Sequence, residues 1–478
     1  MKKTRLILVL LFFVLILSHL PAPVSAQNPV NCGPNGDVQA ILNEVTEPAI
    51  TGWIRRLSGA DPVTIGSTQT YIKTRYTSEL FNGNPNARAY EYITQELISL
   101  GYRRGTFLED HSYVFSTNAP LNLDPSIPDP IPQNIPMVSA KNLVLTIPGT
   151  GPNADQLVLM TAHLDSTSNK PTTDAPGAED NASGVAALLE AARMFRYYKF
   201  DRTIKIIFFT GEEQGLHGSY AYVNDNLSIM PHILGVVNLD MFGYDSDRDM
   251  CFELHVGDLP QSQVVGNCFS DVITNYNLGI KRDYLVGSEA TGRSDHAAFW
   301  AQQVGAVEVL ENFFTNGPSN GCKGIGDQNP HYHRTTDTID NMYRPATHRI
   351  AQAGIGTVAS MAGPLGKCFG GDPVITKVVT DDGILISWNS LDGADSYQVY
   401  RGVNTCLGKM DLVGEVSTNS FLDTDFEYDR NYFYEVMAVD NDGLCLSRFS
   451  NCLVVNVPKP EEPPAVYYQY LPFTMNAE

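Results

Sequence analysis

Four short, almost continuous apolar runs occupy the middle of the chain, at residues 142–147, 157–162, 204–209 and 236–239. Runs of this length without alternation are typical of strands buried on both faces of a parallel sheet. Between the second and third run, residues 182–196 are rich in Ala and Leu and predict a crossover helix. The pattern therefore predicts an α/β fold with a mostly parallel central sheet flanked by helices.

The segment before these runs has a helical pattern. Apolar residues recur along one stripe of residues 86–100, and Gly101 marks the end of that helix. Residues 118–136 are rich in Pro and Asn and predict a surface loop.

The pattern changes again near Gly370, and the chain beyond this glycine has an all-β pattern. Residues 384–388, 397–401, 412–416 and 432–439 alternate or are β-branched, with turn residues between them. Such spacing predicts a small all-β sandwich. A Pro-rich linker and an aromatic tail, a candidate attachment signal, come after it. We therefore expect the divisions 1–26, 27–370, 371–457 and 458–478.

The first division has the pattern of a signal peptide. A basic start precedes the apolar stretch from Leu6 to Leu17, and Val24-Ser25-Ala26 is a small-residue cleavage site. A signal anchor is the alternative. No later run reaches the roughly 18–20 apolar residues of a membrane helix, so we expect a secreted or extracytoplasmic protein. The net charge of −21 argues against a nucleic-acid partner, because acidic surfaces repel phosphates.

The chain has eight cysteines and no CxxC pair, which argues against a cysteine zinc site. In an exported protein an even number of cysteines predicts up to four disulfides. The local pairs Cys251–Cys268 and Cys445–Cys452 are favoured, although the sequence does not fix the pairing.

Acidic residues and a histidine come after the predicted strands. His163 and Asp165 come directly after residues 157–162, and Glu212 and Glu213 come after residues 204–209. Similarly, Asp240 comes after the fourth run, and Asp180 opens the crossover helix. The carboxyl ends of parallel strands share one edge of a sheet, where sites form. These side chains should therefore lie together.

So many acids repel each other unless a cation neutralises them. Imidazole and carboxylate without thiolate suit zinc, and less often manganese or cobalt. The ligand set exceeds the three residues of a single catalytic zinc, so two ions are expected, with Asp180 as the carboxylate that bridges them. Asp165 is placed to accept the free ring N–H of His163. Each motif alone is usually structural, but their conjunction after apolar runs argues against that interpretation.

Residues 75–365 resemble the co-catalytic di-zinc aminopeptidases of the bacterial leucyl aminopeptidase type, which are related to glutamate carboxypeptidases. The resemblance rests on six stretches in the family order: residues 161–166, 176–184, 210–219, 238–241, 294–296 and 332–338.

The resemblance implies a role for each matching residue. His163 and Asp240 would hold one zinc, and Glu213 and His333 the other, with Asp180 as the bridge. Glu212 would be the general base, and Tyr332 could donate to the developing oxyanion, packing being the alternative. Five other residues are expected in lesser positions, as rim, pocket or surface groups: His331, His296, His217, Arg293 and Glu289.

These inferences predict a secreted zinc exopeptidase that removes N-terminal residues from peptides or proteins. A carboxypeptidase or dipeptidase of the same superfamily, a glutaminyl cyclase and a non-catalytic surface binding protein are the alternatives. Residues 373–457 resemble a fibronectin type III domain through Trp388 and residues 396–401 and 432–436. This domain could contact a cell surface, a polymer or a large substrate, or act as a spacer.

Overall fold

The computed structural model describes residues 30–77, 85–116, 137–314, 322, 326–379, 383–403, 410–440, 443 and 445–459. The predicted leader, the predicted loop at 118–136, Cys406 and the tail from residue 460 lie outside them. The chain divides into two compact units, one up to Gly366 and one from Lys367. In the described parts of the chain, no helix has the length and apolar character needed to cross a membrane.

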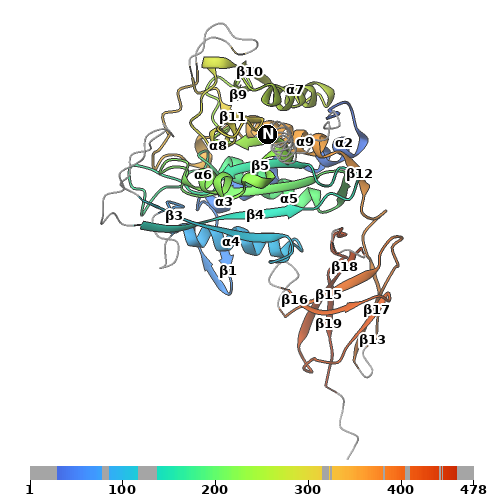
Figure 1. Cartoon of the computed structure of the whole chain (residues 1–478). Coiled ribbons are helices and arrows are strands. Elements are labelled where there is room, and N and C mark those ends of the chain that lie inside the picture. Colours follow the sequence, from blue (N-terminus) through green and yellow to red (C-terminus); the bar gives the residue numbers. More distant parts are fainter. Residues whose placement is uncertain are drawn as a thin grey trace, which may run out of the picture. The chain divides into compact units, whose positions relative to one another are not determined.

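The N-terminal unit is built around an eight-stranded sheet (Figure 1). Its strands, in spatial order, are β10 (Lys281–Leu285), β9 (Cys251–His255), β11 (Ala306–Glu311), β8 (Ile233–Leu239), β5 (Leu157–His163), β7 (Thr203–Phe209), β4 (Met137–Ile147) and β3 (Leu108–Ser116). Two small pairings accompany it, β1 (Val63–Ile65) with β2 (Thr68–Thr70) and β6 (Tyr198–Phe200) with β12 (Pro364–Lys367). All four apolar runs therefore form strands of the central sheet, as predicted.

The sheet is mixed rather than mostly parallel. Its centre is parallel, since β5 pairs in parallel with β7 and β8, and β8 with β11. However, β4 pairs antiparallel with β3 and β7, and β9 pairs antiparallel with β11. An antiparallel strand can be as apolar as its parallel neighbour when both of its faces are covered. The apolar runs therefore predicted the strands but not their directions.

Helices cover both faces of the sheet. They are α2 (Gly36–Glu44), α3 (Glu47–Leu57), α4 (Pro85–Ser99), α5 (Ala182–Phe195), α6 (His217–Asp225), α7 (Pro260–Asn275), α8 (His296–Trp300) and α9 (Arg344–Ala362), with short 3-10 turns at Leu227–His232, Gly287–Glu289 and Ile339–Asn341. The predicted crossover helix is α5, and the predicted helix at 86–100 is α4.

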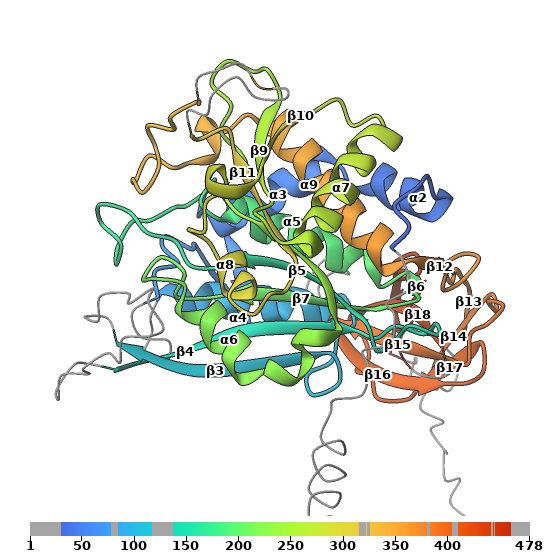
Figure 2. The same cartoon turned by 45° about the horizontal axis from the view of Figure 1, so that its top comes forward.

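Alternate side chains of the strands pack against different helices. Leu157 and Leu159 of β5 join a cluster with Tyr222 of α6 and Phe299 of α8, because successive side chains of a strand point to opposite faces. Helices α5 and α9 pack against each other and against β5, and α7 packs beside α9 (Figure 2). Helix α5 is almost wholly buried, which explains its Ala-rich sequence without a polar face.

The C-terminal unit consists of two antiparallel sheets. One contains β13 (Ile375–Val379), β14 (Ile384–Trp388) and β17 (Ser420–Asp423); the other contains β16 (Asp411–Val416), β15 (Ser396–Gly402), β18 (Asn431–Val439) and β19 (Leu453–Asn456). Trp388 of the first sheet and Val399 and Tyr434 of the second belong to one buried cluster. The four predicted strands of this unit are present.

The disulfides differ from the two local pairs that the sequence favoured. Within the described residues, Cys268 is bonded to Cys32, and Cys251 to Cys322. In the C-terminal unit Cys445 is bonded to Cys368. Both local predictions were wrong because a disulfide requires Cα atoms about 4.4–6.8 Å apart. Closeness in sequence does not provide that distance when the two cysteines belong to different elements, such as β9 and α7.

Candidate metal centre

The predicted ligands are placed by the ends of the central parallel strands. His163 is the last residue of β5, and Asp240 comes directly after β8. Glu213 lies in the turn after β7. Asp180 precedes Asn181, whose side chain caps α5 by accepting the N–H of Gly184 at 2.9 Å. Because β7, β5 and β8 run side by side in the same direction, these four residues meet at one edge of the sheet.

Asp180 stands between two histidines. Its Oδ1 lies 3.4 Å from Nε2 of His163, and its Oδ2 lies 3.3 Å from Nε2 of His333. On the far side, His163 Nε2 is 3.0 Å from an oxygen of Asp240, and His333 Nε2 is 3.0 Å from an oxygen of Glu213. The two oxygens of the Asp180 carboxylate therefore face two separate pairs of candidate metal ligands, His163 with Asp240 and His333 with Glu213.

The donor atoms are close enough to share cations. One group of His163, Asp180 and Glu213 and a second group of His163, Glu212 and Asp240 each offer atoms within 4.8 Å of one another. Imidazole and carboxylate without thiolate is a donor set that suits zinc. In addition, Oε1 of Glu213 is buried without a hydrogen-bond partner among the described residues, and a cation would satisfy it. The residues fit a metal centre.

Burial makes the negative charges of this cluster unfavourable when no cation is bound. Burial raises the pKa of Glu213 to about 7, and the charge of Asp180 adds to the rise. It also raises the pKa of Glu212 well above its usual range. For His163 burial alone would lower the pKa, but Asp240 and Glu212 raise it well above the ordinary value. Without a cation, protonation of these groups thus neutralises part of the negative charge that divalent ions would otherwise balance.

Asp165 differs in detail from the prediction. The ring Nδ1 of His163 lies 3.0 Å from the main-chain carbonyl of Asp165, whereas the carboxylate is 3.7 Å away. The carboxylate instead accepts the main-chain N–H groups of Glu212 and Glu213, at 3.4 and 3.3 Å. The main-chain carbonyl is therefore the nearer acceptor for this ring nitrogen. Asp165 therefore orients the imidazole through its backbone and the two glutamates through its side chain.

A family model connects this geometry to known proteins. Residues 142–358, which contain all five predicted ligands, match the model of peptidase family M28. The matched region runs from within β4 to within α9, and so includes the central strands and the centre at their ends.

Curated proteins and solved structures agree with the match. A probable zinc metalloprotease of Pyrenophora teres f. teres is 28% identical over 249 residues, which cover 49% of this chain and 47% of that protein. Aminopeptidase YwaD of Bacillus subtilis is 31% identical over 199 residues, 41% and 39% of the two chains. The chain thus matches less than half the length of either relative. LapA of Legionella pneumophila shares the fold, with a TM-score of 0.51 and 19% identity over 71% of this chain and 79% of that one.

Tyr332 lies beside the candidate metal centre. Its ring stacks on His333 with centroids 3.8 Å apart and meets Phe313 edge-on at 5.3 Å. The residue is 37% exposed. These ring contacts are those of the packing role, and the donor role stays a prediction.

The remaining candidates do not join the ligand set. His331 lies 3.0 Å from Thr336 Oγ1 through its Nδ1 and contacts the ring of Tyr244. His296 is fully buried and hydrogen-bonds the carbonyl of Thr291, and His217 stacks on Phe115. Arg293 and Glu289 are exposed.

Sequence reasoning missed a buried arginine beside the centre. Arg75 is fully buried, and its guanidinium donates to four main-chain carbonyls at 2.7–2.9 Å, those of Leu57, Leu164, Pro176 and Gly177. Burial lowers its pKa to about 10, against the opposing pull of Asp337 and Asp180. Arg75 thereby fastens the loop after β5 to the loop that leads to Asp180. A lone arginine in a polar stretch gave no signal of this role.

Asp337 was also missed, although it lies in one of the stretches that carry the resemblance. Its two carboxylate oxygens accept the main-chain N–H groups of Glu179 and Asp180, at 2.8 and 3.0 Å. Since Asp337 comes four residues after His333, it fixes the relative positions of two predicted ligands, Asp180 and His333.

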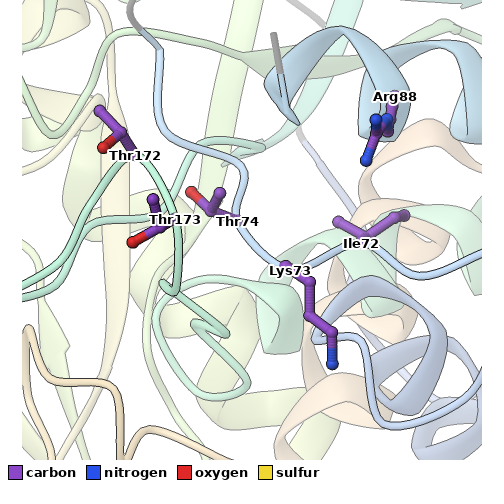
Figure 3. Close-up of a pocket in the computed structure, with 6 residues that line it drawn as sticks. All are labelled: Ile72, Lys73, Thr74, Arg88, Thr172 and Thr173. Carbon is purple, nitrogen blue, oxygen red and sulfur yellow. The ribbon is translucent and has the colours of Figure 1, made fainter.

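A separate hollow lies between the chain near Thr74 and the loop at Thr172 (Figure 3). It has a volume of about 280 Å³, and its lining includes the cationic side chains of Lys73 and Arg88. None of the predicted ligands line it. The hollow is therefore distinct from the metal centre.

Proposed function

We propose that the chain is a zinc aminopeptidase that holds two zinc ions and releases N-terminal residues from peptides. The observation that carries this proposal is Asp180, whose two oxygens face His163 on one side and His333 on the other. Asp240 and Glu213 complete the two sets of donors. When bound, such ions supply Lewis acidity, which polarises a peptide carbonyl and makes water more acidic.

Glu212 is the proposed general base. Its carboxylate oxygen lies 3.9 Å from Nε2 of His163, at the edge of the donor cluster, and its main-chain N–H is held by Asp165. A carboxylate in this position can take a proton from the attacking water and pass it to the leaving amine. Tyr332 is the proposed donor to the oxyanion that develops on the substrate carbonyl.

The choice of the amino end rests on the named relatives, because proteins similar to the matched region include ones named as aminopeptidases. Arg75, the buried arginine beside the centre, donates to main-chain carbonyls and is therefore not free to bind a substrate carboxylate.

A pair of substrates tests this proposal. We expect the protein to release aniline from a leucine anilide with a free amine and to leave the N-acetylated form of the same anilide intact. Cleavage of an amino-blocked dipeptide at a higher rate than the free anilide would instead identify a carboxypeptidase. Failure to hydrolyse either, in zinc-loaded protein, would favour a binding protein.

We further propose that the protein is exported and that residues 373–457 form a fibronectin type III-like sandwich. The disulfides of both units support export, because such bonds persist in oxidising compartments. Two antiparallel sheets with one shared cluster support the sandwich. Contact with a surface polymer is the proposed role of this unit.

A further inference from the structure

Behind the metal centre lies a buried group of two glutamates and one asparagine. Glu179 precedes the proposed bridge Asp180, and Glu311 is the last residue of β11. Asn329 belongs to the chain between β11 and His333. All three are at least nine-tenths buried, so their polar atoms depend on each other rather than on water.

Asn329 supplies the donor between the two carboxyl groups. Its Nδ2 is 3.4 Å from Oε2 of Glu179 and 3.5 Å from Oε2 of Glu311. Its Oδ1 accepts the main-chain N–H of His331 at 2.9 Å. The amide therefore uses both of its ends, and the orientation of its oxygen and nitrogen is fixed by these partners.

The same group also reaches the loop that carries Asp240. Oε1 of Glu179 accepts the N–H of Gly243 at 2.9 Å. The main-chain N–H of Glu311 donates to the carbonyl of Met241 at 2.8 Å. The three residues thus contact all three loops that bear Asp180, Asp240 and His333.

The turn around His333 needs such support. His333 has a φ of 54°, in the left-handed region, where a residue other than glycine is strained and persists only when its surroundings hold it. The N–H of His331 bound by Asn329 and the N–H of Arg334 bound by the carbonyl of His331 provide part of this hold.

We propose that Asn329, with Glu179 and Glu311, is a positioning clamp that sets the place of His333 relative to Asp180 and Asp240. The inference rests on the proposed two-ion function. The clamp acts through the loops and touches neither substrate nor metal. Its loss should therefore weaken the ion held by His333 and Glu213 more than the ion held by His163 and Asp240.

Asn329→Asp tests the clamp because it preserves the shape but replaces the donor with a third acceptor between two carboxyl groups. Metal-ligand supports of this kind cost about 10–100-fold in affinity when removed. We expect zinc titration against a graded chelator to show one of the two ions weakened by about tenfold or more. The melting temperature of the chelator-stripped protein serves as the second readout.

Two further variants make the test specific. Asn169→Asp adds the same charge at an exposed position and keeps the acceptor for the N–H of Thr335, so we expect it to bind both ions as wild type does. Adding Glu311→Gln to Asn329→Asp returns an N–H donor to the cluster, and we expect part of the lost affinity to return.

The clamp is refuted if Asn329→Asp binds both ions with unchanged affinity. It is also refuted if both ions weaken equally and Glu311→Gln restores nothing, because a general loss of packing gives that result together with a lower melting temperature. Wild-type protein that binds no zinc would overturn the proposed function itself, which separates the two failures.

Discussion

At the scale of single residues, the centre is an assembly of buried acids that the chain fixes from several directions. Asp165 holds the N–H groups of Glu212 and Glu213, and Asp337 holds those of Glu179 and Asp180. Each carboxylate thus restrains a neighbouring loop through two adjacent amides. Such supports are needed because reacting groups must be held within a fraction of an ångström.

Glu212→Gln separates base chemistry from metal binding. The substitution preserves size and removes the group that takes the proton, so we expect both zinc ions to remain while kcat falls by roughly 10²–10⁴-fold. Elemental analysis and anilide hydrolysis on the same sample provide the measurement. Wild-type turnover in this variant would refute the base assignment, and loss of zinc would mean that Glu212 serves as a ligand.

The candidate metal ligands could be found in the sequence, whereas the residues that hold the ligand-bearing loops in place could not. His163 and Asp240 stood out because polar groups directly after buried strands need a reason to be there. Arg75 lies far from the ligands in sequence, and Asn329, although only four residues before His333, belongs to no periodic pattern and carries no metal-ligand signature. Their roles arise from contacts with carbonyls and loops that only the folded chain brings near.

At the scale of elements, the apolar runs predicted where the strands lie in the sequence, but not the directions in which neighbouring strands pair. The run at 204–209 became β7 (Thr203–Phe209), with a difference of one residue. The antiparallel pairing of β7 with β4 could not be foreseen, because apolarity reports burial and not direction. The disulfide pairs were wrong for the related reason that pairing depends on how elements meet.

The disulfide between Cys251 and Cys322 ties the segment between β11 and His333 to the start of β9. We expect this bond to support the position of His333. Replacing both cysteines by serine removes the tie, and we expect stability to fall by about 2–5 kcal/mol and zinc affinity to fall with it. The matched control replaces Cys32 and Cys268, whose bond lies outside this segment. We expect the Cys32 and Cys268 variant to lose stability, measured by denaturation, but to keep its zinc affinity, measured by chelator titration. Equal zinc affinities in the two variants would contradict this role.

At the scale of the whole molecule, buried histidines should make the N-terminal unit sensitive to acid. His255 is fully buried; its Nδ1 accepts the N–H of Thr291, and its Nε2 lies 3.0 Å from Glu253. Burial lowers its pKa to about 3, against about 6.5 in an unfolded chain. Only the unfolded state takes up this proton as the pH falls below about 6.5, so the stability contributed by His255 is lost between that pH and about 3. Burial raises the pKa of its neighbour Glu253 to about 8, and protonation of that carboxyl in the folded state offsets part of this loss.

His255→Asn tests the contribution of this histidine, because its Oδ1 can still accept the N–H of Thr291. We expect the melting temperature of the chelator-treated protein to fall less between pH 7 and pH 5 in the variant than in wild type. The exposed His232, changed to Asn, is the control. Equal slopes in wild type and His255→Asn would show that protonation of this site does not drive acid unfolding.

The central claim is that two zinc ions occupy the acidic edge of the sheet in the active protein. The most direct test is the metal content of purified, active protein, measured together with its response to a strong chelator. We predict two zinc ions per chain, loss of hydrolysis on chelation and its return when zinc is restored. Active protein that contains no transition metal and is indifferent to the chelator would contradict the account.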